Sequence, residues 1–140
     1  REDNVFPGKH NTAESHELFR NTDFHPGARP IGNEGIAHYD YQLHALCREA
    51  GINHLVYTGF ALDACLLMAA CGMVDMQRRG YLCSVIREAT TACEMKETAH
   101  DEGCKQMALW RVSVFFGFVF GVSDFIGAME RIALSSSRLS

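Results

Sequence analysis

Three short apolar runs, separated by longer segments of mixed polarity, set the pattern of this chain. The first run, Leu55–Tyr57, has the length and composition of a buried strand. The runs Tyr81–Ile86 and Phe118–Val122 repeat this pattern later in the sequence. We therefore expect three clear strands, and a fourth, weak strand around Gly35–His38.

Segments with helical spacing of apolar residues alternate with these runs. Asn11 or Thr12, Asp40 and Ser123 are the expected caps of three of the helices. The helices are expected at Ala13–Phe19, Tyr41–Ala50, Cys65–Cys71, Val74–Arg79, Met95 or Lys96 to Val114, and Asp124–Leu134. Strands that alternate with helices predict an α/β fold, a three-layer, Rossmann-like sandwich with a mainly parallel sheet between helices.

The distribution of proline and polar residues predicts how the chain is divided. Residues 1–30 contain all three prolines and are expected to form an irregular N-terminal segment. Residues 31–134 carry the alternating pattern and form the α/β domain, whereas 135–140 form a polar tail that frays.

Composition narrows the classes of partner and compartment. The 140 residues are 47% hydrophobic, enough for one core, and the net charge of −4 with no basic stripe argues against nucleic-acid binding. The longest apolar run is interrupted and too short to span a bilayer, and the sequence opens without the apolar segment of a signal peptide. We expect no membrane partner and a cytoplasmic location.

The six cysteines bear on metal and redox chemistry. Four of them lie inside apolar periodic segments, and no Cys-x-x-Cys or Cys/His zinc spacing occurs, so free thiols are expected rather than disulfides or a metal site. His10, His16 and His25 lack the spacing of a metal site and are expected to be solvated loop residues. No nucleotide-binding glycine motif is present, and we expect no cofactor.

Cys65 is the candidate with the most specific chemistry. The break at Thr58-Gly59 ends the first strand, and Cys65 then opens a helix. Unpaired N–H groups at that point favour a thiolate and can bind the oxyanion formed when the thiolate attacks a carbonyl. The alternative is a buried structural cysteine, a common role for this residue type.

The stretch VYTGFALDACLLMAACGM resembles the nucleophile loop of the isochorismatase-like cysteine hydrolases, with Gly59, Phe60, Ala61 and Cys65 on the family pattern. The resemblance implies a cis peptide bond before Ala61. It also implies an oxyanion hole formed by the N–H groups of Ala61 and Cys65, with Gly59 and Phe60 beside the substrate. It covers roughly Ile31–Leu134, and Glu88-Ala89-Thr90 stands where the family often has Asp-Ala-Thr.

Two departures from the family pattern concern the catalytic triad. The family has an Asp at the end of its first strand and a Lys before the nucleophile strand, but this sequence shows neither. The expected Lys position falls near Gly32, and only Lys9 and Arg29 are cationic candidates nearby. Three or four of the family's six strands are visible, so the first one or two strands are expected to be absent. A histidine from His38, His44 or His54 is a substitute base.

These observations support three hypotheses. The first is a cysteine-dependent hydrolase of a small amide, imide or related C–N bond, with Cys65 as nucleophile. The second is a non-catalytic binding or oligomerisation domain that keeps the loop and lacks the full Asp-Lys-Cys triad. The third is an incomplete chain, whose Asp and Lys lie in residues not given. The resemblance also implies a small-molecule substrate and a homo-oligomer.

Overall fold

The computed structural model describes residues 11–20 and 22–136, in two compact units that divide after Gly35. The N-terminal unit contains α1 (Thr12–Arg20), which confirms the helix expected there, and a short 3-10 helix, η2 (Pro26–Ala28). His25 accepts a hydrogen bond from the Gly27 N–H at the start of η2, at 3.1 Å from Nδ1. Lys9, His10 and the tail after Ser136 lie outside the described residues.

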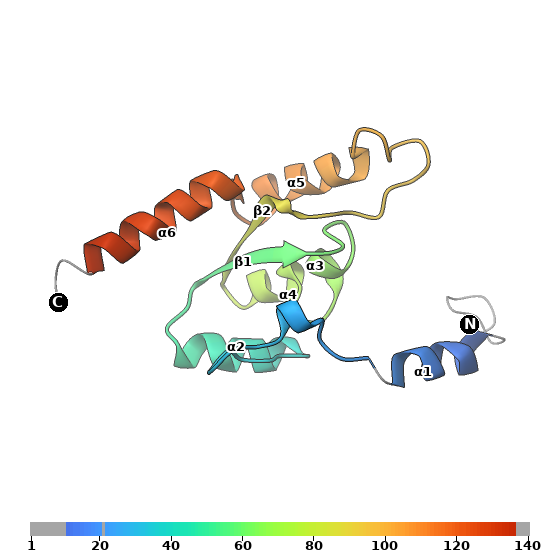
Figure 1. Ribbon diagram of the computed structural model, residues 1–140. Coiled ribbons are helices and arrows are strands. Elements are labelled where there is room, and N and C mark those ends of the chain that lie inside the picture. The colour runs from blue at the N-terminus through green and yellow to red at the C-terminus, as the bar shows by residue number, and fades with distance from the viewer. Residues whose placement is uncertain (1–10, 21, 137–140) are drawn as a thin grey trace. The chain divides into compact units, whose positions relative to one another are not determined.

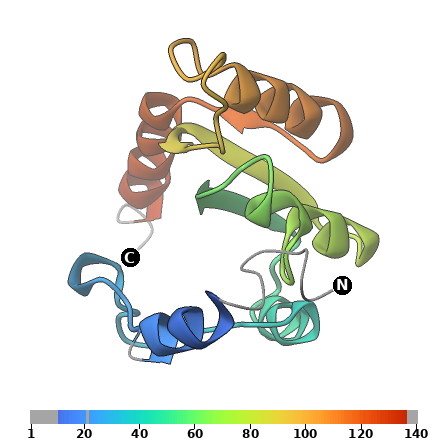
Figure 2. The same cartoon turned by 90° about the vertical axis from the view of Figure 1, so that its right-hand side faces the viewer.

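The second unit is built around a three-stranded parallel sheet in the order β1-β2-β3 (Figure 1). Its elements are α2 (Asp40–Glu49), β1 (His54–Gly59), α3 (Cys65–Met68), α4 (Met73–Arg78), β2 (Leu82–Thr90), α5 (Gly103–Phe115), β3 (Val119–Phe120) and α6 (Val122–Ser136). Figure 2 shows α4 and α5 on one side of the strands and α6 on the other. The predicted α/β class with helices on both faces is confirmed.

The hydrophobic core lies between the sheet and helices α2 to α5. Alternate strand residues point into it, because side chains of a strand face opposite sides in turn. Its buried members are Cys47, Leu62, Leu67, Met73, Met76, Tyr81, Cys83, Val85, Ala108, Leu109 and Val112, and Leu55, Tyr57 and Val119 pack against them. Two crossover helices on the same face follow from three parallel strands placed in chain order with right-handed connections.

Several predicted boundaries are wrong. Gly35–His38 forms no strand, since the segment makes no ladder with β1, β2 or β3. The helix expected over Cys65–Cys71 ends at Met68, because Ala69 is extended and Cys71 has a left-handed φ of 70°. A new helix, α4, then begins at Met73, as the restart expected near Val74 allowed.

Strand β2 is longer than predicted and diverges from β1 at its carboxyl end. Tyr57 pairs with Val85, but Gly59 pairs with Thr90, so five residues of β2 oppose two of β1. In the diverging part, a Glu88 carboxylate oxygen accepts the Val122 N–H at 2.8 Å, which fixes the start of α6. The contact lowers the pKa of Glu88, chiefly through this backbone hydrogen bond.

The opposite face of the sheet contains a buried polar contact. The Ser84 side chain is fully buried, and its Oγ accepts the Phe118 N–H at 2.8 Å and lies 2.7 Å from His54 Nε2. The residue before Phe118 is Gly117, and only a glycine fits there, because a Cβ would lie 2.5 Å from the Cys83 carbonyl oxygen. The glycine therefore allows the close approach of the chain entering β3 to β2.

Helix α5 begins at Gly103, several residues after the predicted start at Met95 or Lys96. The carboxylate of Glu94 accepts hydrogen bonds from the N–H groups of Cys104 and Lys105, both at 2.9 Å. These donors of the first turn have no acceptor within the helix, so Glu94 caps α5 from outside it. The residues between fold as turns, and Glu102 has a left-handed φ of 56°. Helical periodicity alone could not locate this cap, because it depends on a side chain nine residues before the helix.

This cap gives a pH-dependent prediction. Hydrogen bonding by Thr98 and by the two amides lowers the pKa of Glu94 from 4.5 to about 2. A lowered folded-state pKa stabilises the fold above the unfolded-state value, and this contribution is lost as the pH falls from about 4.5 towards 2. At pH 7 we expect Glu94→Gln to unfold at a lower urea concentration than wild type. The difference between the two urea midpoints is expected to shrink as the pH falls from about 4.5 towards 2.

The matched control is Glu97→Gln, which changes the same group three residues away. Glu97 forms no hydrogen bond or ion pair with any residue of the described segments. Its variant is expected to follow the wild-type urea midpoint at every pH. If the difference in urea midpoint between Glu94→Gln and wild type stays the same from pH 7 to pH 3, the assignment of this cap is contradicted.

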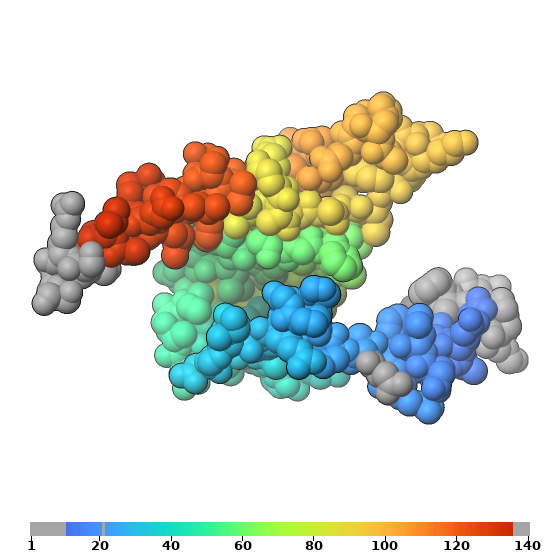
Figure 3. Space-filling view, viewed as in Figure 1, coloured from blue at the N-terminus to red at the C-terminus, as the bar shows by residue number. Residues whose placement is uncertain are grey.

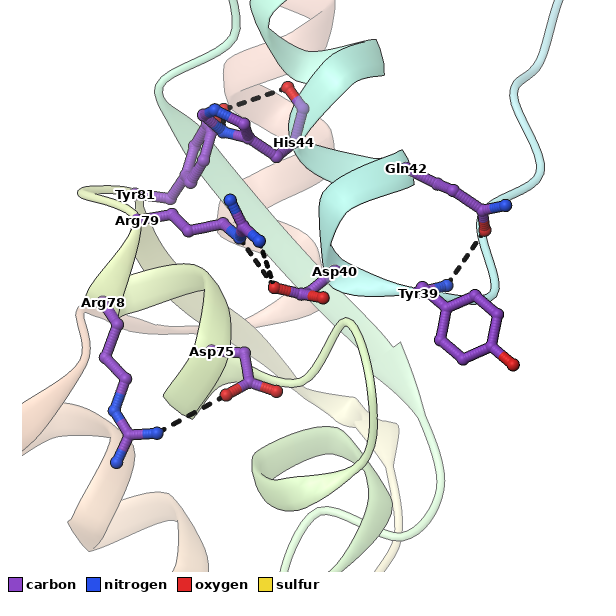
Figure 4. Close-up of polar contacts among 8 residues, drawn as sticks. All are labelled: Tyr39, Asp40, Gln42, His44, Asp75, Arg78, Arg79 and Tyr81. Atoms are coloured by element: carbon purple, nitrogen blue, oxygen red, sulfur yellow. Dashed lines mark hydrogen bonds and ion pairs between the residues drawn. The ribbon is translucent and has the colours of Figure 1, made fainter.

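Helix α2 is joined to α4 by polar contacts rather than by burial alone (Figure 4). Arg79 donates from Nε to a carboxylate oxygen of Asp40 at 2.7 Å, and this hydrogen bond lowers the pKa of Asp40. Tyr81 OH lies 2.8 Å from His44 Nδ1, a second contact to α2. Asp40 was expected to cap α2, but the cap position is Tyr39, because the Asp40 carboxylate is turned towards Arg79 instead.

Candidate active site

The nucleophile loop joins the carboxyl end of β1 to α3, and its backbone is held by the chain that follows β2. Leu62 donates its N–H to Thr91 O at 2.7 Å, and Thr91 donates its own N–H to Gly59 O at 3.2 Å. An Asp63 carboxylate oxygen accepts the Cys93 N–H at 2.9 Å. The Leu62 side chain is fully buried in the core, so the loop is fixed by packing as well as by hydrogen bonds.

The peptide bond between Phe60 and Ala61 is cis, as the resemblance implied. Ala61 uses its carbonyl oxygen to accept the N–H groups of Ala64 and Leu66, at 3.2 and 3.0 Å. Among the described residues, the N–H groups of Ala61 and Cys65 have no hydrogen-bond acceptor. The two amides expected to bind an oxyanion thus have no partner among the described residues, and the same holds for the amides of Phe60 and Asp63.

The thiols of the chain differ in exposure. Cys65 and Cys93 are exposed, whereas Cys47 and Cys83 are buried. Burial raises the pKa of Cys47, and it raises the pKa of Cys83 to about 11, so both keep their protons at neutral pH. Cys65 is therefore an accessible thiol next to free amides, and the alternative of a buried structural cysteine does not apply to it.

Among the candidate histidines, none forms a hydrogen bond with the Cys65 sulfur. Within the described segments, no acidic, cationic or histidine side chain forms a hydrogen bond with Sγ. His44 lies against Tyr81, and His54 lies against Ser84 at the start of β1, whereas Cys65 follows the end of β1. Arg29 belongs to the N-terminal unit, where it forms an ion pair with Asp23.

A cavity of about 380 Å³ lies beside the nucleophile loop, at the start of α5. It is lined by Asp63 and Arg111, together with Thr98, Gly103, Cys104 and Met107. The sequence analysis did not identify this cavity, because only the Cys93–Asp63 contact and the late start of α5 bring these residues together. One acidic residue of the nucleophile loop and one basic residue of α5 thus border the same cavity.

The described residues contain no group of three or more His, Cys, Asp or Glu side chains that could hold a metal ion. Of the helices in the described ranges, none has the length and apolar content needed to cross a bilayer.

Comparison with known proteins decides the family. The model of the isochorismatase domain matches residues 12–116, about three quarters of the chain. The chain belongs to the isochorismatase family. This match, over residues 12–116, begins before the range Ile31–Leu134 over which the sequence resembled the family, and it ends just after α5.

Curated relatives within the isochorismatase family are ureidoacrylate amidohydrolases. RutB of Caulobacter vibrioides is 30% identical over 95 residues, which are 68% of this chain and 38% of that enzyme. RutB of Pantoea ananatis is 32% identical over 91 residues, 65% of this chain and 33% of that enzyme. The matched part of the chain thus spans 33–38% of the length of these relatives.

A solved structure agrees with the isochorismatase fold. An isochorismatase-like hydrolase from Alkaliphilus metalliredigens superimposes with a TM-score of 0.58 and 23% identity. The similarity covers 76% of this chain and 57% of that one. The fold is therefore shared, although the sheet described here has three strands.

Proposed function

We propose that this chain acts as a cysteine-dependent hydrolase of a small amide, imide or related C–N bond, with Cys65 as the nucleophile. The observation that supports this most is the nucleophile loop, where an exposed thiol lies with two unpartnered amides after a cis peptide bond. The amidohydrolase relatives support C–N bond cleavage as the reaction class. The cavity at Asp63 and Arg111 supports a small polar substrate.

In the proposed reaction, the Cys65 sulfur forms a bond to the substrate carbonyl carbon, and the carbonyl oxygen becomes an oxyanion. The N–H groups of Ala61 and Cys65 bind this oxyanion, which lowers the barrier because the donors are already oriented. The C–N bond then breaks, and the amine leaves with the thiol proton. Water hydrolyses the resulting thioester to a carboxylic acid and restores the thiol.

The competing proposal is a non-catalytic domain that binds small molecules or other chains. One observation favours it: no described acid or cation forms a hydrogen bond with the Cys65 sulfur, so the base and the cation of the family triad are not seen at this thiol. The two proposals differ in whether Cys65 is more reactive than an ordinary exposed thiol. That difference can be measured without knowing the substrate.

Alkylation by iodoacetamide tests the proposal with a control inside the same chain. Cys65 and Cys93 are both exposed, but only Cys65 lies at the unpartnered amides of the loop. We expect Cys65 to be carbamidomethylated about tenfold faster than Cys93 at pH 7, and the buried Cys47 and Cys83 to react only after unfolding. Peptide mass spectrometry over a time course gives the four rates. Equal rates at Cys65 and Cys93 would favour the non-catalytic domain.

A further inference from the structure

The cavity at the start of α5 is bordered by two residues of opposite charge, and we call it the α5 cavity. Asp63 comes from the nucleophile loop, and Arg111 comes from the third turn of α5. Figure 3 shows the segment after β2 and the start of α5, in yellow to orange, directly above the green surface of the nucleophile loop. The volume of about 380 Å³ falls in the range of about 300–1,000 Å³ that is typical of small-molecule sites.

Both charges of the α5 cavity are available to a ligand. Within the described ranges, Arg111 forms no hydrogen bond or ion pair. Asp63 accepts the Cys93 N–H with one carboxylate oxygen, Oδ1, and forms no ion pair in the same ranges. Because Asp63 and Arg111 do not pair with each other, a ligand anion can pair with the arginine and a ligand cation with the aspartate.

Two other carboxylates at the start of α5 are already engaged. Glu94 accepts the N–H groups of Cys104 and Lys105, and Glu102 pairs with the Lys105 ammonium group at 3.1 Å. Neither glutamate borders the cavity, whose lining contains one acidic and one basic residue. The charge pattern that a ligand meets there is therefore one negative and one positive group.

The wall between the two charges is mainly apolar. Cys104, Met107 and Arg111 follow the three- and four-residue spacing of one helix face, and Met107 is 51% exposed. The backbone of Arg111 lies about 10 Å along the helix axis from that of Cys104, at about 1.5 Å per residue. Thr98 Oγ1 already accepts the Met95 N–H at 3.0 Å. Aliphatic carbons between two charged ends of a ligand suit such a wall.

We propose that the α5 cavity binds a small zwitterion, with its carboxylate at Arg111 and its ammonium group at Asp63. A guanidinium can donate two parallel hydrogen bonds to one carboxylate, and an ammonium group donates to carboxylate oxygens. A ligand with a single charge leaves the opposite residue without a partner. If the proposed hydrolase holds, on which this extension rests, the substrate class is an amide of an amino acid whose carbonyl group reaches Cys65.

Isothermal titration calorimetry at pH 7 and low salt tests the site without turnover, because no probe contains an amide. The zwitterions are glycine, γ-aminobutyrate and ε-aminocaproate, which separate the two charges by different lengths. Each is compared with the acid and the amine of the same chain length, which carry one charge. We expect at least one zwitterion to bind at least about tenfold more tightly than both of its singly charged analogues.

Two variants assign the two ends of the ligand. Arg111→Gln is expected to weaken binding of the preferred zwitterion about tenfold and to leave the matching amine within about twofold. Asp63→Asn is expected to weaken the zwitterion similarly and to leave the matching acid within about twofold. The asparagine keeps an oxygen for the Cys93 N–H. The control is Arg48→Gln, the same change at an exposed arginine of α2 outside the cavity, which is expected to bind like wild type.

Urea unfolding of the three variants establishes that a loss of binding is not a loss of fold. The proposal is overturned if no zwitterion binds more tightly than its singly charged analogues. It is also overturned if Arg111→Gln and Asp63→Asn bind the preferred zwitterion like wild type. The alkylation ratio of Cys65 to Cys93 is measured separately. A chain that binds the zwitterion but alkylates both thiols at equal rates keeps this site and loses the proposed hydrolase activity.

Discussion

Replacing Cys65 by alanine is expected to reduce amide hydrolysis at least about 1000-fold, to the rate of the uncatalysed reaction in the same buffer. The physical reason is that, in the proposed mechanism, the sulfur supplies the attacking electron pair, and the amides of Ala61 and Cys65 stabilise only an oxyanion that this attack creates. The measurement is release of ammonia from a panel of small primary amides and ureides. Intact-mass analysis of quenched wild-type reactions should show one acyl group on Cys65.

The control for this experiment is Cys93→Ala, because Cys93 is the other exposed thiol and its hydrogen bond to the loop is made by the backbone N–H, which alanine keeps. Its rate is expected to remain within about twofold of wild type. If Cys65→Ala and Cys93→Ala hydrolyse the panel at the same rate as wild type, Cys65 is not the nucleophile. If the wild-type chain neither releases ammonia nor accumulates an acyl group, the non-catalytic domain is the better description.

Leu62→Ala is expected to lower the free energy of unfolding by about 2–5 kcal/mol. The side chain is fully buried in the core, and its removal leaves a cavity beneath the nucleophile loop. The same change should lower the alkylation rate of Cys65 towards that of Cys93, since the loop loses its attachment to the core. Urea unfolding followed by circular dichroism gives the first quantity, and peptide mass spectrometry gives the second.

The matched control is Met68→Ala, an aliphatic truncation in α3 at a side chain that is 67% exposed. Met68→Ala is expected to lower the free energy of unfolding by less than about 0.5 kcal/mol, because little apolar surface is buried there. A Leu62→Ala variant as stable as Met68→Ala would show that the loop is not held by core packing. A stable variant with slow Cys65 alkylation would instead separate loop geometry from fold stability.

The positions of the strands were predictable because short apolar runs bounded by glycine carry enough local information. The run at Leu55–Tyr57 lies within β1, and Tyr81–Ile86 gives the first part of β2. The cis bond before Ala61 came from the resemblance and not from periodicity, since nothing in the local pattern of Phe60 and Ala61 favours that isomer. Family pattern and physical pattern thus contributed different parts of the site.

The wrong boundaries have a common physical cause. Helix α5 starts late because Glu94 caps it from a distance, and β2 runs on because its carboxyl end turns towards α6 and Glu88 meets Val122. Both are contacts between residues separated in sequence, which propensity and periodicity do not encode. The same is true of the contact between Asp63 and Cys93, which holds the nucleophile loop but left no signal in the sequence.

The links between the loop and the segment after β2 have a mechanical consequence. Backbone groups of Gly59 and Leu62 are both bonded to Thr91, and Asp63 is bonded to Cys93. The loop that carries Cys65 is therefore attached both to β1 and to the segment that follows β2. Fraying of β1 would break the bond at Gly59 but leave the bonds from Leu62 to Thr91 and from Asp63 to Cys93 in place, so the loop that leads to Cys65 is expected to keep its shape on warming longer than β1 does.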